Sequence, residues 1–325
     1  MKLPRRNFMH LAAGAAALPA ASRFAWAQAY PMRPVRIIIG FAPGGVVEIV
    51  ARLIGQSLSE RLGQPFIIES RPGAASNIAT EAVVRAPPDG YTLLVVSSAN
   101  AINATLYDKL NFVFLRDIAP IASIIRHPFV MVVNPAVPAK TVPEFIAYAK
   151  ANPGKLTMAS GGIGAATHLA GELFKVMTSV DIVHVPYRGL ATSLTDLLGG
   201  QVQVAFASTV SSIEYVKTGR LRALAVTAAT RSDALPDIPT VDEFVPGYEA
   251  SIWFGIGAPN NTPTEILDKL NNEINAAVAD PNMKARLADL GGTILAGSPA
   301  DFGKFIADET EKWGKVIRAV NIKAD

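Results

Sequence analysis

The sequence has no cysteine among its 325 residues. Disulfides, thiol nucleophiles and thiolate metal sites are therefore excluded, and so is a lipid anchor of the lipoprotein type, which needs a cysteine. Charge is also sparse, since 18% of the residues are charged and 50% are hydrophobic. That composition is typical of a globular chain and excludes intrinsic disorder. A chain of this length buries roughly three-quarters of its unfolded surface, which is enough for two ordinary cores.

The chain also has almost no net charge once its first 27 residues are set aside. These hold Lys2, Arg5, Arg6 and Arg23 and no acidic residue, so they carry +4 against a total of +3. The remainder has 26 basic side chains (30 minus these four) against 27 acidic ones, a net charge of −1. Nucleic acids and anionic membranes bind concentrated positive charge. A nucleic-acid partner is therefore not expected.

The first 27 residues have the layout of a cleaved secretory signal peptide. The pair Arg5-Arg6 precedes an apolar stretch from Leu11 to Ala21, and such a pair is typical of a twin-arginine export signal. Ala25-Trp26-Ala27 fits a small-residue cleavage site, and Ala27-Gln28-Ala29 fits it nearly as well. The apolar stretch is too short for a spanning helix, which needs ~20 residues, and no later stretch is long enough either. We expect residues 1–27 to be removed and the mature protein to be periplasmic.

Short β-branched runs alternate with amphipathic stretches from Tyr30 onward, which predicts βαβ units and a largely parallel sheet. The first strand is expected at Val35–Gly40 and the first helix at Val46–Leu62. Capping boxes predict helix starts at Thr141 and Thr262, and a last helix should run from Ser298 to about Val320. Further strands are expected at Phe66–Glu69, Tyr91–Ser97, Phe129–Asn134, Leu156–Ser160, Ile182–Pro186, Val202–Phe206, Leu221–Val226 and Ile252–Gly257.

Ten or so strands exceed what one sheet of this kind usually holds, so two sheets in two lobes are expected. No Gly/Ser-rich linker divides the chain, which favours lobes joined by two crossing strands at Phe129–Asn134 and Ile252–Ala258. The predicted fold class is α/β, with residues 28–128 and 253–325 in lobe 1 and residues 129–252 in lobe 2.

Four turns that follow predicted strands are rich in glycine, hydroxyl and amide residues. Ligands of open α/β sheets bind at such turns, where helix amino termini present unpaired N–H groups to anions. A glycine at a turn can equally serve the turn geometry alone. The pattern favours a small anion held largely by neutral groups. The turns are Phe41-Ala42-Pro43-Gly44-Gly45, Ser97-Ser98-Ala99-Asn100, the stretch from Ser160 to His168, and Pro186-Tyr187-Arg188-Gly189.

Enzyme signatures are mostly missing. The sequence has no P-loop, no G-x-S-x-G elbow, no H-E-x-x-H and no complete dinucleotide fingerprint. His168 and Glu172 lie four apart, which is half of a metal site, but without a second ligand cluster we interpret them as a structural pair. Neither a metal nor a cofactor is expected. If the protein is instead an exported hydrolase of a carboxylate ester, Glu48 or His168 is its candidate base. Independently of this alternative, Arg188 is the best candidate cation at a turn, although a solvated surface arginine fits the same position.

Ordered motifs along residues 30–325 resemble one known family. They are Pro43-Gly44-Gly45, Arg71-Pro72-Gly73-Ala74, Ala86–Leu93, His168–Glu172, His184–Gly189, Asp196–Val202 and Lys312-Trp313-Gly314. The chain thereby resembles the periplasmic substrate-binding receptors of tripartite tricarboxylate transporter systems, often called Bug receptors.

The resemblance implies a type II periplasmic binding protein, a flytrap of two lobes joined by two crossing strands. It implies a non-catalytic, monomeric receptor that closes on a small carboxylate and delivers it to the membrane permease subunits of a transporter. A receptor that feeds a membrane sensor has the same sequence features. The candidate ligand contacts are Phe41, Gly44, Gly45, Glu48, Ser97, Ser98, Asn100, Ser160, Gly161, Gly164, Thr167, His168, Tyr187 and Ser208.

Two positions depart from the family's usual pattern. Val46-Val47-Glu48 stands where the family usually has x-Thr-Asp, and Ala207-Ser208 stands where it often has Asp-Asn. Loss of a pocket carboxylate disfavours an amino-acid ligand, whose ammonium needs a negative partner. The departures favour an aromatic or aliphatic carboxylic acid.

Overall fold

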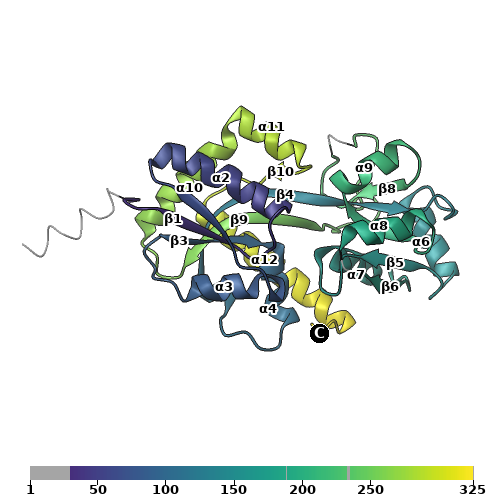
Figure 1. Cartoon of the computed structure of the whole chain (residues 1–325). Helices are drawn as coiled ribbons and strands as arrows, with labels where there is room; N and C mark the ends of the chain where they lie inside the picture. Colours follow the sequence, from purple (N-terminus) through teal and green to yellow (C-terminus); the bar gives the residue numbers. More distant parts are fainter. Residues whose placement is uncertain (1–29, 188, 233–234, 325) are drawn as a thin grey trace, which may run out of the picture.

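The structure is a computed structural model that describes residues 30–187, 189–232 and 235–324. The predicted signal peptide and the candidate cation Arg188 lie outside these residues. Figure 1 shows two α/β lobes side by side, with the extended strands β4 (Ile118–Val133) and β9 (Ser251–Pro259) running toward the junction between them. The predicted α/β, two-lobed fold class is confirmed.

The first lobe is built as the sequence predicts, from strands that alternate with helices. Its parallel strand β1 lies between β2 and β3. Helices α2 and α10 cover one face of the sheet, and α3, α4 and the first turns of α12 cover the other. The elements are β1 (Val35–Ile39), α2 (Val46–Leu62), β2 (Phe66–Ser70), α3 (Asn77–Val84), β3 (Thr92–Ser97), α4 (Ser98–Leu106), α5 (Phe114–Asp117), α10 (Thr264–Ala279), α11 (Pro281–Asp289), β10 (Thr293–Ile294) and α12 (Pro299–Val320).

The second lobe continues the same alternation. Its strands β5, β6 and β7 run parallel to one another, and β7 and β8 pair antiparallel with the end of β4. The strand order is β2-β1-β3-β9-β4-β7-β5-β6, so the two expected sheets share the strand β4. The elements are α6 (Val142–Ala151), β5 (Thr157–Ser160), α7 (Ala166–Thr178), β6 (Val183–Pro186), α8 (Leu190–Leu198), β7 (Val204–Ser208), α9 (Thr209–Lys217) and β8 (Arg222–Val226).

Strand β4 (Ile118–Val133) is longer than predicted and joins the lobes together with β9 (Ser251–Pro259). Residues 118–128 of β4 pair with β9, and residues 129–133 pair with β7 and β8. The sequence indicated only the second of these two segments. The first contains Pro120 and Pro128, and two register shifts interrupt its pairing with β9, so its pattern is not that of a regular strand.

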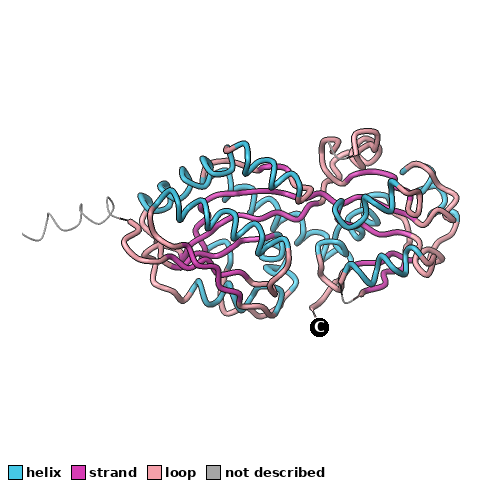
Figure 2. Tube along the Cα trace, turned by 45° about the horizontal axis from the view of Figure 1, so that its top comes forward, coloured by secondary structure: helices cyan, strands magenta, loops and turns pink. Residues whose placement is uncertain are grey.

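Thr227 joins the two connecting segments where they enter the second lobe. Its hydroxyl accepts a hydrogen bond from the Phe129 amide (2.7 Å) and donates one to the Ala250 carbonyl (2.6 Å). The residue is 0% exposed, so these bonds form without competition from water. Figure 2 shows magenta strands that extend from the first lobe into the junction between the two lobes.

Helix α12 begins in the first lobe and ends against the second. Phe302 and Ile306 pack in a cluster with α3 and β3 residues, whereas Trp313, Val316 and Ile317 share a core with α7. The helix starts as predicted, because the Ser298 hydroxyl accepts from the amide of Asp301. The yellow helix in Figure 1 therefore connects the lobes in addition to β4 and β9.

The capping box predicted at Thr262 is wrong. Helix α10 begins at Thr264 with Pro263 in the cap position, and the Thr262 hydroxyl donates instead to the carbonyl of Pro259 (2.7 Å). The other predicted cap, Thr141, is confirmed, since its hydroxyl accepts from the Glu144 amide. A threonine after a strand can therefore close the strand's own turn and leave the following helix uncapped.

Candidate functional site

A cavity of about 840 Å³ lies between the lobes. Its walls come from the turns after β1, β3 and β5, from the inner side of α4, and from strand β9. It is lined by Phe41, Val46, Val47, Ala75, Ser97, Ser98, Ala99, Ile102, Asn103, Leu106, Tyr107, Gly161, Gly162, Ile163, Gly164, Ala165, Ala166, Pro186, Tyr187, Ile252, Phe254 and Ala324. Within the described residues, no Lys, Arg, His, Asp or Glu side chain lines it.

Three helix amino termini meet at this cavity. The first turns of α2, α4 and α7 contribute Val46, Ala99 and Ala166 to its lining. In the described structure neither α2 nor α7 has a side chain that accepts from its first amides, whereas α4 starts in a capping box made by the side chains of Ser97 and Asn100. Each terminus carries unpaired N–H groups and a partial positive charge. The cavity therefore offers an anion neutral donors from both lobes.

A buried amide network fixes helix α4. The Asn100 Oδ1 accepts from the Ser97 amide (2.8 Å), and its Nδ2 donates to Thr80 (2.8 Å). One turn later, Asn103 Nδ2 donates to the Ala75 carbonyl (2.8 Å) and to Asn77 (2.9 Å). These bonds hold the turn after β3 against the loop before α3. Asn100 thus acts on the backbone and is not part of the cavity lining.

Side chains also hold the glycine-rich loop after β5. The Gly161 amide donates to the Thr167 hydroxyl (3.0 Å) and the Gly162 amide donates to the Ser160 hydroxyl (3.1 Å). The Gly164 amide donates to Nδ1 of His168 (3.1 Å). Three amides that the sequence offered to a ligand are therefore occupied within the loop.

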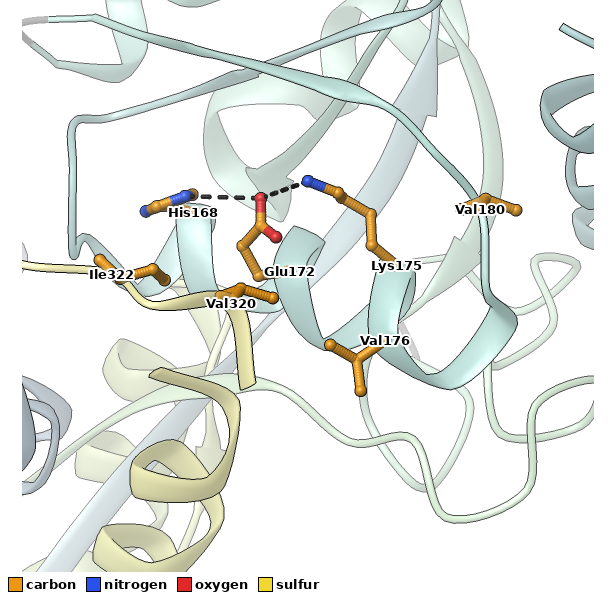
Figure 3. Close-up of a pocket in the computed structure, with 7 residues that line it drawn as sticks. All are labelled: His168, Glu172, Lys175, Val176, Val180, Val320 and Ile322. Carbon is orange, nitrogen blue, oxygen red and sulfur yellow. Dashed lines mark hydrogen bonds and ion pairs between the residues drawn. The ribbon is translucent and has the colours of Figure 1, made fainter. Parts of the chain in front are cut away.

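His168 lies behind this loop and not in the cavity lining. Its ring is 4% exposed and stacks on the His184 ring, with centroids 3.6 Å apart. Figure 3 shows the Glu172 carboxylate between His168 and Lys175, at 3.5 and 2.8 Å from their nitrogen atoms. The hydrogen bonds from His168 and Lys175 outweigh burial and lower the pKa of Glu172. These residues line a separate cavity of about 360 Å³ between α7 and the end of α12.

The Glu48 side chain folds back toward the amino terminus of its own helix, α2. Its carboxylate accepts from the Gly44 amide (2.6 Å) and from Arg52 Nε (2.7 Å). The Gly44 amide, and then the Arg52 guanidinium, hold the pKa of this carboxyl below its usual range. A carboxylate held ionised in this way is a weak base, and it does not line the cavity.

The structure brings together only part of the predicted site. Six of the predicted residues line the cavity, namely Phe41, Ser97, Ser98, Gly161, Gly164 and Tyr187. The other eight do not line it, namely Gly44, Gly45, Glu48, Asn100, Ser160, Thr167, His168 and Ser208. Gly44 and Gly45 are exposed beside it. The Ser208 hydroxyl caps α9 by accepting from the amide of Ser211. Tyr187 donates to Asp196 (2.7 Å), and burial together with this bond raises its pKa to about 12.

The apolar part of the lining was not predicted from the sequence. Ile102 and Leu106 come from α4, Tyr107 directly follows that helix, and Ile252 and Phe254 come from β9. The four residues within α4 and β9 fit the periodicity of a core-facing helix or strand, so their pattern did not indicate a cavity.

Two further features concern the described residues alone. They contain no group of three or more His, Cys, Asp or Glu side chains placed to hold a metal ion. No helix among them is both long enough and apolar enough to cross a membrane.

Residues 50–322 match the sequence model of the "Tripartite tricarboxylate transporter family receptor". This match covers most of the chain, including both lobes and β4. The chain belongs to this receptor family.

Curated relatives match over nearly their whole length. The protein BugT of Bordetella pertussis is 35% identical over 300 residues, which cover 91% of this chain and 92% of BugT. An uncharacterised protein from the tcbD-tcbE intergenic region of Pseudomonas sp. (strain P51) is 34% identical over 299 residues, covering 91% and 89%. The family assignment therefore extends over both lobes of this receptor.

Solved structures of family members share its fold. Rpa4515 of R. palustris, solved with adipate, is 36% identical, with a TM-score of 0.77 over 90% of this chain and 99% of that one. MatC of Rhodopseudomonas palustris, solved with malate, is 30% identical, with a TM-score of 0.73 over 89% and 100%. The periplasmic binding protein BugD is 32% identical, with a TM-score of 0.74 over 91% and 100%.

The departures from the family pattern now have places in the receptor. Val46 and Val47 give the first helix start an apolar face toward the cavity, while Glu48 is paired to Arg52. Ala207 is buried in the core under α8 and Ser208 caps a helix. No described carboxylate side chain therefore faces the cavity from either position.

Proposed function

We propose that this protein is a periplasmic receptor that binds a small carboxylate in the cavity between its lobes. The observation that carries the proposal is the convergence of three helix amino termini on one cavity, two of which, α2 and α7, have no side-chain cap in the described structure. Such termini bind carboxylates through backbone N–H groups. The adipate and malate in the structures of Rpa4515 and MatC support the same ligand class.

The ligand we propose is an aliphatic or aromatic acid with a large apolar part. Large apolar side chains line the cavity, among them Ile102, Leu106, Ile163, Ile252 and Phe254. Transfer of an apolar group from water to such a surface makes the free energy of binding more favourable by about 25 cal/mol per Å² of buried apolar area. An amino acid would leave its ammonium without an anionic partner among the described lining residues, which is unfavourable in a closed cleft.

Binding is proposed to close the lobes. One lobe would comprise residues 28–128 and 253–325, and the other would comprise residues 129–252. The lobes would move about residues 128–129 and 250–251, where Thr227 joins the two connecting segments. The end of α12 belongs to the first of these lobes by sequence and packs on α7 of the other. The loaded receptor would act as a monomer and deliver its acid to permease subunits in the membrane. The first 27 residues would serve as its export signal.

The receptor is proposed to be non-catalytic. The two candidate bases of a hydrolase are engaged elsewhere, Glu48 with Gly44 and Arg52, and His168 with Gly164. An acid or ester incubated with the protein for hours should be recovered unchanged. Product formed in excess over the protein, as measured by chromatography, would instead show that the protein is an enzyme.

A thermal-shift screen over adipate, malate, hexanoate, benzoate and glutamate tests the ligand class. A ligand at a hundred times its Kd stabilises the folded state by ~2.7 kcal/mol, which raises the unfolding temperature by several degrees. We expect hexanoate, benzoate or adipate to raise it and glutamate to leave it unchanged. A shift with none of the acids would overturn the proposal.

Replacing Ala99 by Asp should weaken acid binding without harming the fold. Ala99 lies in the first turn of α4 at the cavity, where an aspartate is favourable to the helix dipole but repels a bound carboxylate. We expect the affinity for the best acid of the screen to fall about tenfold or more by titration calorimetry. The matched control is Thr264→Asp in the first turn of the exposed start of α10. Equal affinities of the two variants would remove α4 from the site.

A further inference from the structure

The buried His168 is the residue whose role neither the family nor the cavity lining explains. It is 4% exposed, lies on the first turn of α7, and touches the loop after β5 through one ring nitrogen only. We infer that His168 is a positioning residue, which holds the cleft loop by accepting the Gly164 amide on an unprotonated Nδ1. The inference rests on the proposed function, because it concerns the shape of the proposed ligand cavity.

The hydrogen bonds around the ring assign its tautomer. Nδ1 accepts from the Gly164 amide (3.1 Å), so it carries no proton. Nε2 faces the Glu172 carboxylate at 3.5 Å and carries the proton. Lys175 holds Glu172 ionised at 2.8 Å, which keeps an acceptor opposite Nε2. Figure 3 shows this row of three side chains along α7.

The ring is also fixed in position from its face. His184 on β6 stacks against it with the planes 11° apart, and His184 Nε2 forms a 2.6 Å hydrogen bond with the Ser160 hydroxyl. Ser160 in turn accepts from the Gly162 amide. Hydrogen bonds thus hold the loop at two positions. Ser160, which is bonded to His184, holds Gly162, and His168 holds Gly164.

The grip on Gly164 matters because Gly164 touches the other lobe. A Cβ built on it would lie 2.4 Å from the Leu106 side chain of α4, and its φ of +72° is a left-handed value that favours glycine. Gly164, Ile163 and Leu106 all line the cavity. If Gly164 loses its acceptor, the loop loses its defined approach to α4, and the cavity loses part of its wall.

Two replacements of His168 separate the Nδ1 acceptor from the rest of the ring. In His168→Asn the side-chain Oδ1 takes the place of Nδ1, whereas in His168→Gln the terminal amide takes the place of Nε2 and leaves Gly164 without a partner. A general effect on packing would affect both variants, since both lose the stack on His184. An effect through Gly164 spares Asn and affects Gln.

The first measurement needs no ligand. Amide hydrogen exchange by NMR on the mature chain should show Gly164 protected in the wild type and in His168→Asn, and exchanging about tenfold faster in His168→Gln. The imidazole ¹⁵N spectrum of the wild type should show a protonated Nε2 and an unprotonated Nδ1. His127→Asn, which changes another buried histidine, should leave Gly164 protected. An unprotected Gly164 in the wild type, or equal exchange in the Asn and Gln variants, would overturn the inference.

The second measurement connects the loop to binding. Titration with adipate and with hexanoate should give affinities within threefold of the wild type for His168→Asn and about tenfold weaker for His168→Gln. Equal weakening in both variants would assign His168 to packing alone. If neither acid binds the wild type, the proposed function fails, while the exchange experiment still decides the role of His168.

Discussion

Replacing Glu309 by Ala is expected to destabilise the protein by about 3–5 kcal/mol. Glu309 lies on α12 and is 4% exposed. Its Oε2 accepts from the indole N–H of Trp253 (3.0 Å) and of Trp313 (2.9 Å), and its Oε1 pairs with Lys312. Truncation leaves two buried indole donors without an acceptor, each at a cost of about 1–3 kcal/mol. Lys312 keeps its second partner, Glu249 (2.9 Å), which limits the loss.

This network also explains how α12 is held to the connecting segments. Trp253 belongs to β9, and Glu249 lies two residues before that strand. Together with Glu309 they join the helix to the segment that passes between the lobes. Burial lowers the pKa of Lys312, but the two carboxylates outweigh it and raise the pKa overall. Lys312 therefore remains charged throughout the neutral range.

Urea unfolding at pH 7.5 measures the effect of Glu309→Ala, with Glu311→Ala as the matched control. Glu311 lies on the same helix, and its partner Lys315 is exposed, so its loss should change the free energy of unfolding by at most about 0.5 kcal/mol. Glu309→Gln keeps one acceptor for the indoles and should fall between the two. An equal midpoint and slope for Glu309→Ala and Glu311→Ala would show that the buried carboxylate contributes nothing.

Much of the fold was predictable because its local patterns are regular. Helix α2 was predicted at its observed bounds, and α12 differs only by its cap residue, Ser298. The first part of β4 was missed because Pro120 and Pro128 interrupt it and its partner β9 is distant in sequence. Two-residue β10 was missed as well, since it exists only by pairing with β4. Pairing between distant segments leaves little trace in the local pattern.

The site was predictable in location but not in detail. Glycine and hydroxyl turns after β1, β3 and β5 indicated where helix starts meet, and the cavity lies there. The same polar side chains can contact either a ligand or the backbone that carries them. Asn100, Thr167 and Ser208 hold backbone amides or a neighbouring side chain. The sequence contains no feature that distinguishes these two roles, because both require a short polar side chain at a helix start.

Acidification from pH 6.5 to pH 4 is expected to reduce the free energy of unfolding steeply. Burial lowers the pKa of His127 to about 4, and burial is also the largest cause that lowers the pKa of His184 to about 4. In the unfolded chain both titrate near 6.5. Between about pH 6.5 and pH 4 the unfolded state therefore binds two more protons than the folded state does, so the free energy of unfolding decreases as the pH falls through this range. The slope should approach about 1.4 kcal/mol per pH unit for each histidine.

The two histidines have different surroundings, so their contributions can be separated. His127 on β4 is 8% exposed and packs edge-on against Phe254, and its Nε2 has no partner among the described residues. His184 faces His168, Glu172 and Lys175, of which only Glu172 favours its charged form. His127→Phe keeps the ring and removes the proton site, so it isolates the effect of the more fully buried group.

Urea unfolding between pH 7.5 and pH 4.5 should give a free energy that falls with pH in the wild type. In His127→Phe the slope should be smaller by about 1.4 kcal/mol per pH unit, and His184→Phe should remove a similar amount. A free energy that does not change between pH 6.5 and pH 4.5 in the wild type would mean that neither histidine is held neutral by the fold. An unchanged slope in His127→Phe alone would place the proton uptake elsewhere.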